Sequence, residues 1–510
     1  MEEVKYFLIQ KMTREKNFTF NILSNIAVQI IVAISGFIIP RFILSIFGST
    51  TNGMINSISQ FLTYAGLVEL GIGNASIVAL YKPIAQNDTN SICVIMSSVK
   101  RKYFTSGCLY TVIIVCFAFI YPLCIKGQLN YWFSFTMVII IAGNSIIDFF
   151  ILGKYKVLLI ADQKNYIINF TKAFVTVVST VVSCYILILG NTVTVVKITV
   201  VFFHLSEALF IRWYVQSKYR DVNYYVQGYI KLEQQRGSLI HQLCNVITYN
   251  TDLVVLTLFV SNESLKEVSV YSVYMLAFGA ICNLMSCFTT GIEAIFGDMI
   301  VKKEREKVRK AFEIYKSVYL TIIYIAYSSF IVLVVPFVRC YTHGITDVNY
   351  IRIEIGILFG LNGLLANLKD AHGVVIRAYG NYKETQFYMI GEAVTNIIVS
   401  LLLVHFFGIV GVLIGTNISH FIASIGLLWY ADKYLLDRKF YKDLKENFIN
   451  IFSSLALIII EINNVFNVSS WKLWILSAII VFSINTIFLC LVNIFTNKKM
   501  WKSEMEYLKK

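Results

Sequence analysis

The sequence predicts an all-α polytopic membrane protein with about fourteen transmembrane helices. The first observation behind this prediction is composition: of 510 residues, 57% are hydrophobic and 15% are charged, which is rare in soluble domains. The second is that long apolar runs recur along the chain, separated by short polar segments. A bilayer core about 30 Å thick needs roughly 20 apolar residues per helix, and these runs are long enough to cross it.

The chain opens with a charged segment, residues 1–19, and no small-residue cleavage site follows the first apolar run. We therefore expect residues 1–19 to form a cytoplasmic segment that stays attached, in contrast to a signal peptide. The spans are expected at residues 20–40, 54–80, 104–125, 131–152, 165–189, 193–211, 240–260, 268–300, 313–338, 353–376, 384–404, 408–431, 448–466 and 471–495.

Positive charge alternates between the two sides of these spans. Most of the 44 Lys and Arg residues fall in the segments that would be cytoplasmic. The opposite side holds Arg41, Lys126, Lys266, Arg339, Arg352 and Lys472. This pattern follows the positive-inside rule and requires an even number of spans with both termini cytoplasmic. The net charge of +14 is thus explained by topology and anionic lipid, and we expect no nucleic-acid partner.

The spans group into two halves of six helices with a weak internal similarity. We expect an N-lobe at 20–211, a cytoplasmic linker at 212–239 and a C-lobe at 240–431. Residues 432–510 would hold the last two helices and a cytoplasmic tail. Six helices separate the similar stretches, an even number, so the repeat is parallel, which is one of the two common transporter plans.

Polar side chains recur at helical spacing inside several spans. The span at 165–189 carries one face of Asn169, Lys172, Thr176, Ser179 and Ser183. Such faces indicate either a polar cavity or hydrogen bonds between helices, and the uncharged residues leave both readings open. Charged residues inside a span are costly, so they mark candidate sites: Arg41, Glu69, Asp148, Lys172, Asp252, Glu293, Lys369, Arg377, Glu392 and Glu461.

Other residue types predict no separate chemistry. The ten Cys residues form no CxxC pair and lie mostly in apolar runs, so we expect no disulfide frame and no metal site. The pairs Gly356-xxx-Gly360 and Gly411-xxx-Gly415 predict close helix packing. His372, beside Asp370, is more readily explained as a histidine hydrogen-bonded in the bundle than as a proton shuttle. No segment resembles an ATP-binding GxxxxGK[ST] loop, and no cofactor is expected.

Three stretches resemble a known family. They are FGSTTNGMINSISQFLTYAGLVELGIGNAS, YNTDLVVLTLFVSNESLKEVSVYSVYMLAF from Tyr249, and RAYGNYKETQFYMIGEAVTNIIVSLLLVHFFGIVGVLIGTNISH from Arg377 to His420. They resemble the bacterial polysaccharide-export flippases, the translocases of O-antigen and capsule repeat units. These belong to the multidrug, oligosaccharidyl-lipid and polysaccharide exporter superfamily. The resemblance covers most of the chain, apart from the last two helices.

The resemblance implies two six-helix lobes and two additional helices that work by alternating access in the bacterial cytoplasmic membrane. The implied substrate is an undecaprenyl-diphosphate-linked oligosaccharide, and the implied energy source is an ion gradient. A glycan polymerase or export machinery would be a further partner. Substrate-contact candidates are Arg41, Asn169, Lys172, Asn245, Lys369 and Arg377. Ion-coupling candidates are Glu69, Asp148, Asp252, Glu293 and Glu392.

Three alternatives remain. A drug or cation antiporter of the same superfamily would have isolated acids in a smaller cavity, in contrast to the broad amide- and hydroxyl-rich faces of this chain. A lipid II flippase would have more arginines in its first spans, where Arg41 stands nearly alone. A membrane enzyme such as a polymerase or acyltransferase would have a long external loop or an embedded catalytic histidine, and neither pattern is found in the sequence.

Overall fold

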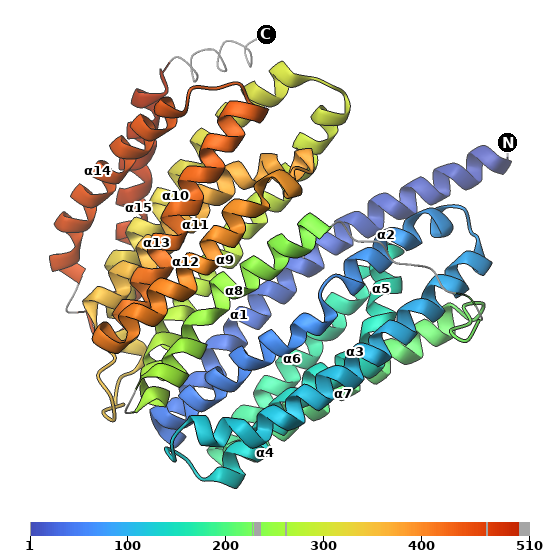
Figure 1. Ribbon diagram of the computed structural model, residues 1–510, viewed down its shortest axis with the longest axis horizontal. Coiled ribbons are helices and arrows are strands. Elements are labelled where there is room, and N and C mark those ends of the chain that lie inside the picture. The colour runs from blue at the N-terminus through green and yellow to red at the C-terminus, as the bar shows by residue number, and fades with distance from the viewer. Residues whose placement is uncertain (1, 227, 229–235, 261–262, 466–467, 499–510) are drawn as a thin grey trace. The chain divides into compact units, whose positions relative to one another are not determined.

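A computed structural model describes the whole chain except residues 1, 227, 229–235, 261–262, 466–467 and 499–510 (Figure 1). The described residues are helical, with short connections and no β-strand. Eleven helical stretches among them are long and apolar enough to cross a membrane. The predicted fold class, an all-α polytopic membrane protein, is confirmed.

The chain divides into two compact units between residues 235 and 236, inside the linker predicted at 212–239. The elements of unit 1 are α1 (Glu2–Ala65), η1 (Gly66–Glu69), α2 (Ile72–Ala85), α3 (Thr89–Cys124), α4 (Tyr131–Ile147), η2 (Asp148–Leu152), α5 (Gly153–Ala161), α6 (Asn165–Ile188) and α7 (Val193–Lys218). The elements of unit 2 are α8 (Arg236–Phe259), α9 (Ser264–Val301), α10 (Arg305–Tyr341), α11 (Ile353–Tyr379), α12 (Tyr382–Phe407), α13 (Ile409–Tyr430), η3 (Ala431–Leu435), α14 (Phe440–Val465) and α15 (Trp471–Thr496).

The predicted spans lie on helical structure over their described residues, and residue 466, the end of the span predicted at 448–466, lies outside them. The borders differ most near the N-terminus. The polar loop expected between the first two spans is helical, because α1 continues through it and departs from helical geometry at Gly48 (φ 78°). The second span, expected to be continuous over 54–80, is interrupted after Ala65 by the short helix η1 and by Gly71 (φ 81°). Glycine reaches such positive φ values without the strain that a Cβ causes. The helix breaks therefore lie at glycines, and a prediction based on polar segments placed them at the wrong residues.

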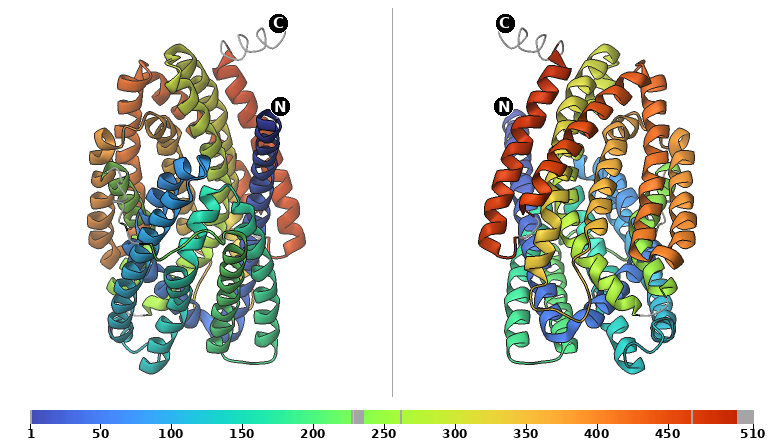
Figure 2. Two further views of the ribbon diagram at one scale, coloured as in Figure 1. Left: turned by 90° about the vertical axis from the view of Figure 1, so that its right-hand side faces the viewer. Right: turned by 90° about the vertical axis from the view of Figure 1, so that its left-hand side faces the viewer.

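Helices of unit 1 lie side by side along a common direction, as do those of unit 2 (Figure 2). In unit 1, α1 packs along α6, α3 along α4, and α7 along both α6 and α4. The predicted linker begins later than expected, since α7 extends to Lys218. Its described part folds onto α3, where the backbone N–H of Asn223 donates to Cys93 Sγ at 3.1 Å and that of Val226 donates to Ser97 Oγ at 3.0 Å.

Small residues let the helices of unit 2 approach closely. A Cβ on Gly356 would lie 2.8 Å from Val334 Cγ1, and one on Gly360 would overlap Ile331, both on the facing helix α10. A Cβ on Gly411 or Gly415 would overlap Leu403 or Ser400 of α12. The prediction that these glycine pairs mark close packing is confirmed.

At one end of unit 2, an ion pair joins α9 to the start of α11. Arg352 donates two hydrogen bonds to Glu267, at 2.7 and 2.6 Å, and its backbone N–H donates to Tyr274 Oη at 3.0 Å. Arg352 lies in the connection that precedes α11, and its hydrogen bonds to Glu267 raise the pKa of the guanidinium above its ordinary value. The guanidinium is therefore charged throughout the physiological pH range.

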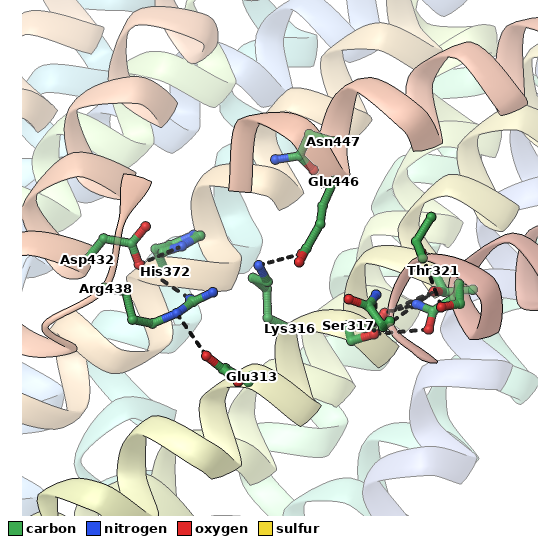
Figure 3. A network of polar contacts seen from close by, with 12 residues as sticks. Glu313, Lys316, Ser317, Thr321, His372, Asp432, Arg438, Glu446 and Asn447 are labelled. Carbon is green, nitrogen blue, oxygen red and sulfur yellow. Dashed lines mark hydrogen bonds and ion pairs between the residues drawn. The ribbon is translucent and has the colours of Figure 1, made fainter. Parts of the chain in front are cut away.

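The last two helices belong to unit 2, where both pack on α10. Figure 3 shows how polar side chains make this contact. Buried Lys316 on α10 pairs with Glu446 on α14 at 2.7 Å, and Asn493 on α15 hydrogen-bonds Ser317 at 2.9 Å. Farther along α15, Asn485 donates to Ser329 at 3.0 Å. In lipid such bonds contribute about 0.6–2 kcal/mol each, so α14 and α15 are integral to the unit.

Candidate functional site

Most of the candidate ionisable side chains within the spans form separate clusters, each inside one unit. The most buried cluster joins α11, α12 and α13. Glu392 Oε1 accepts from Lys369 Nζ at 2.6 Å and faces His420 Nδ1 at 2.6 Å, and the Glu392 and His420 side chains are fully buried. The Tyr249 ring of α8 lies 5.7 Å from Lys369 Nζ. Lys369 and Glu392 were predicted for different roles, substrate contact and ion coupling, yet they neutralise each other.

A second cluster surrounds Asp252 on α8. Its carboxylate accepts from Tyr271 Oη at 2.8 Å and from Thr416 Oγ1 at 2.9 Å. Asn396 on α12 donates its amide to the same threonine oxygen at 2.9 Å. Asp252 is thus a buried carboxylate held by neutral hydroxyl groups, with no cation paired to it among the described residues.

Within the part of the chain that the structure describes, two oxygen atoms near Asp252 have no hydrogen-bond partner. One is Asn396 Oδ1, and the other is Thr248 Oγ1, one turn before Asp252 on the same face of α8. Buried acceptors without donors cost free energy, and oxygen atoms of these kinds are ligands that a small cation can use.

A third cluster is partly exposed. Arg377 near the end of α11 donates from Nε to Glu293 of α9 at 2.8 Å and from Nη1 to Asp370 at 2.7 Å. The three side chains are about one-third exposed. Because two carboxylates surround one guanidinium, Arg377 is not free to receive a diphosphate in this arrangement unless a carboxylate moves away.

Unit 1 contains a cluster around Asp148, the first residue of the π-helical turn η2. Lys156 Nζ donates to Asp148 Oδ1 at 2.9 Å. His204 on α7 lies between Asp148 and Glu207, with its ring nitrogens 3.5 and 3.1 Å from the two carboxylates. Nearby, Tyr103 Oη of α3 donates to Glu69 Oε1 at 2.7 Å. The predicted residues Asp148 and Glu69 therefore lie in one region of unit 1.

The remaining predicted substrate contacts differ in their surroundings. Asn169 is buried and donates to Ser24 of α1 at 3.1 Å, which is a bond between helices. Lys172, one turn later on α6, is exposed and has no ion pair among the described residues. Asn245 is exposed on α8, and Arg41 is half-buried on α1 directly after Pro40.

Sequence reasoning missed several partners in these clusters. His204 and Glu207 are three residues apart on one face of α7, a spacing that could have indicated them. His420 is the last residue of the stretch from Arg377 to His420 that resembles the flippases, but the sequence predicted no role for it. Arg438, which lies between Asp432 and Glu313 in Figure 3, follows the π-helical turn η3 and gave no periodic signal. His372 has its Nε2 3.9 Å from this Asp432, and Asp370 pairs with Arg377.

Comparison with known proteins defines a class of fold. No protein-family model matches the sequence, and no curated protein sequence matches it either. Solved structures do match, and the fold is that of multi-pass transporters of the MOP superfamily.

Particular structures illustrate the likeness. The lipid II flippase MurJ, in an inward closed conformation, matches with a TM-score of 0.65 at 14% identity, covering 93% of this chain and 99% of that one. An inward-facing multidrug resistance MATE family transporter matches with a TM-score of 0.59 at 14% identity, covering 81% and 98%. A eukaryotic MATE transporter gives 0.57 at 13% identity, covering 82% and 95%. At such identities the likeness establishes the fold alone.

Proposed function

We propose that this protein is a flippase that moves undecaprenyl-diphosphate-linked oligosaccharide repeat units from the cytoplasmic to the outer leaflet of the bacterial cytoplasmic membrane. The units would then enter surface polysaccharide synthesis, such as O-antigen or capsule. The observation that carries the proposal is the extent of the structural match. The lipid II flippase matches 93% of this chain, whereas the two MATE transporters named above match 81% and 82%. A lipid-linked substrate is therefore favoured over a soluble drug.

The way α14 and α15 are attached supports this choice. These helices pack on α10 through the pair Lys316–Glu446 and through Asn493 and Asn485, which bury polar groups that lipid could not satisfy. A helix pair held in this way moves together with α10. We infer that α14 and α15 serve the transport of the lipid-linked substrate.

Lys172 is the residue that we propose for contact with the diphosphate. A charged side chain in a span costs at least about 2.5 kcal/mol, so it is seldom kept without a partner or a function. Lys369 and Arg377 have carboxylate partners, whereas Lys172 is exposed and has none among the described residues. An ammonium group that is not neutralised by a carboxylate can bind a phosphate oxygen directly.

For coupling to an ion gradient we propose Asp252. Its carboxylate, Asn396 Oδ1 and Thr248 Oγ1 are buried oxygen atoms from α8 and α12, and Thr416 of α13 connects Asp252 to Asn396. A cation or proton at this position would bind three helices of one unit together. Its release would loosen those helices, which is the kind of change that alternating access requires.

The proposal is tested in cells that lack the gene. We expect radiolabelled oligosaccharide-lipid to accumulate on the cytoplasmic leaflet and surface glycan to be lost. Lys172→Gln should fail to restore surface glycan and Lys172→Arg should restore it, with unchanged expression of both. Lys126→Gln, at an exposed lysine in the turn after α3, is the control for charge loss. Normal surface glycan with altered sensitivity to cationic drugs would refute the proposal and support a drug antiporter.

A further inference from the structure

His204 sits near the middle of α7 between two carboxylates. Its Nδ1 lies 3.1 Å from Glu207 Oε2, and its Nε2 lies 3.5 Å from Asp148 Oδ1. A neutral imidazole has one N–H donor and one nitrogen lone pair. In this geometry a neutral ring would point that lone pair at a carboxylate, which is repulsive. With both nitrogens protonated, Nδ1–H donates to Glu207, and Nε2–H, which makes no hydrogen bond among the described residues, carries positive charge at ion-pair distance from Asp148, so the arrangement fits an imidazolium.

The π-helical turn creates this arrangement. In η2 the backbone N–H of Gly153 donates to Asp148 O, five residues back. In a regular α-helix, Lys156 would lie about 80° around the axis from Asp148, eight residues before it. The π turn absorbs one residue, so Lys156 is placed as a residue seven positions away would be, about 20° from Asp148. The turn therefore brings Lys156 onto the carboxylate that faces His204.

The charges of the ion-paired groups balance when the ring is protonated. Asp148 and Glu207 contribute two negative charges, and Lys156 contributes one positive charge. An imidazolium makes the cluster neutral, and a neutral ring leaves it at minus one. Beyond these groups, Glu69 accepts a hydrogen bond from Tyr103 on the neighbouring helix α3. Helix α4 has no charged side chain, and the single charge of α6, Lys172, is exposed. Helix α5 adds Lys154, and α7 itself carries Lys197 two turns before His204 and Arg212 two turns after it.

The cluster is partly open to exchange. The side chains of Asp148 and Lys156 are 35% and 32% exposed and that of His204 is 19% exposed, whereas Glu207 is buried at 5%. The Glu392–His420 cluster of unit 2 is fully enclosed, with both side chains at 0%. A group that carries a proton must be able to gain and lose it, and the His204 cluster meets that condition better.

We propose that His204 is a proton-carrying residue of unit 1 and that its proton is exchanged during the transport cycle. This inference rests on the proposed ion-driven flippase and names the ion at this cluster as a proton. Loss of the proton from buried Nε2, by way of the partly exposed Asp148 carboxylate to water, leaves a neutral ring and a cluster of charge minus one. Rebinding restores neutrality. His204 would thus convert a proton gradient into a change of charge between α7 and the π-helical turn.

The protonation state can be measured without substrate. The full chain, labelled with ¹⁵N-histidine and reconstituted in nanodiscs, has six histidines, and the His204 signal is the one lost in His204→Gln. At pH 7.5 an ordinary histidine, with a pKa of about 6.5, is mostly neutral. We expect His204 to be an imidazolium at that pH and to become neutral in the double variant Asp148→Asn with Glu207→Gln. A neutral His204 ring in the wild-type protein would overturn the inference.

Transport in proteoliposomes tests the exchange. The probe is the undecaprenyl-linked oligosaccharide extracted from the producing cells, and the driving force is a pH gradient. With one proton per substrate, each pH unit should give about a tenfold ratio between leaflets in the wild type. His204→Gln and His204→Arg should bring the ratio to one, whereas His405→Gln, at an exposed histidine on α12, should not change it.

The His204→Arg variant distinguishes a residue that carries a proton from one that only forms a permanent ion pair with the carboxylates. If His204→Arg follows the pH gradient like the wild type, a fixed charge suffices and the carrier role is wrong. A wild-type protein that flips the substrate with sodium but ignores the pH gradient also overturns the carrier role, and leaves the proposed function intact. A wild-type protein that flips no oligosaccharide-lipid under any gradient contradicts the proposed function instead, and the nanodisc titration still reports the charge of His204.

Discussion

Substituting Gly415 by alanine should destabilise unit 2, because its Cβ would meet backbone atoms. The added atom would overlap Ser400 Oγ and lie 2.7 Å from the backbone nitrogen of Ser400 on α12. A side chain can rotate away, but a helix backbone can move only together with its helix. The neighbouring residue Thr416 also links Asp252 to Asn396, so separation of α12 from α13 would strain those hydrogen bonds.

The size of the effect follows from two opposing contributions. Overpacking in a well-packed core costs up to about 3 kcal/mol, and contact with backbone puts this site near the upper end. Alanine gains about 1 kcal/mol over glycine in helix propensity. The overpacking is larger, and we expect a net loss of roughly 2 kcal/mol in the free energy of unfolding. For a unit of this size, about 2 °C per kcal/mol places the melting temperature roughly 4 °C lower.

The assay is thermal unfolding of the purified full chain, followed by intrinsic fluorescence. Gly391→Ala on α12 is the matched control, since its Cβ would have no neighbouring atom of the described residues within 4 Å. That variant should melt at or slightly above the wild-type temperature. A Gly415→Ala protein that melts as high as the Gly391→Ala protein would refute the close approach of α12 and α13.

Two further predictions follow. Lys369→Met and Glu392→Gln each break the buried Lys369–Glu392 pair, and each should lower the free energy of unfolding by about 3 kcal/mol or more. The double variant should lose clearly less than the sum of the two single losses, and additive losses in a thermal double-mutant cycle would argue against the pair. Arg352→Lys should lower the melting temperature, because lysine cannot donate two parallel bonds to Glu267. Those bonds raise the pKa of Arg352, so the stabilisation from its charge is complete below the unfolded pKa and is lost only as pH rises through the still higher folded pKa. The difference in melting temperature between wild type and Arg352→Lys should therefore be constant from about pH 7 to 9. A difference that decreases between these two pH values would contradict the assignment.

The candidate site was only partly visible in the sequence. A charged residue inside an apolar run is conspicuous, and Glu69, Asp148, Asp252, Glu293, Lys369, Arg377 and Glu392 were all found in this way. Their partners were not, because the pairs lie far apart in sequence: Lys369 and Glu392 are 23 residues apart, and Asp252 and Thr416 are 164 apart. Spacing along one helix says nothing about which neighbouring helix supplies the opposite charge. Lys172 differs from Lys369 only in what surrounds it.

The sequence by itself determined the fold class, because a lipid bilayer requires long apolar helices and leaves a periodic record of them. It also located the glycines that bring α11 and α13 close to their neighbours. The tertiary structure decided where helices break, since Gly48, Gly71 and the π-helical turn after Ile147 interrupt the regular geometry without a change in polarity. It also decided which intramembrane charges are neutralised and which are not, because the electrostatic free energy of a buried charge depends on groups within a few ångströms in space.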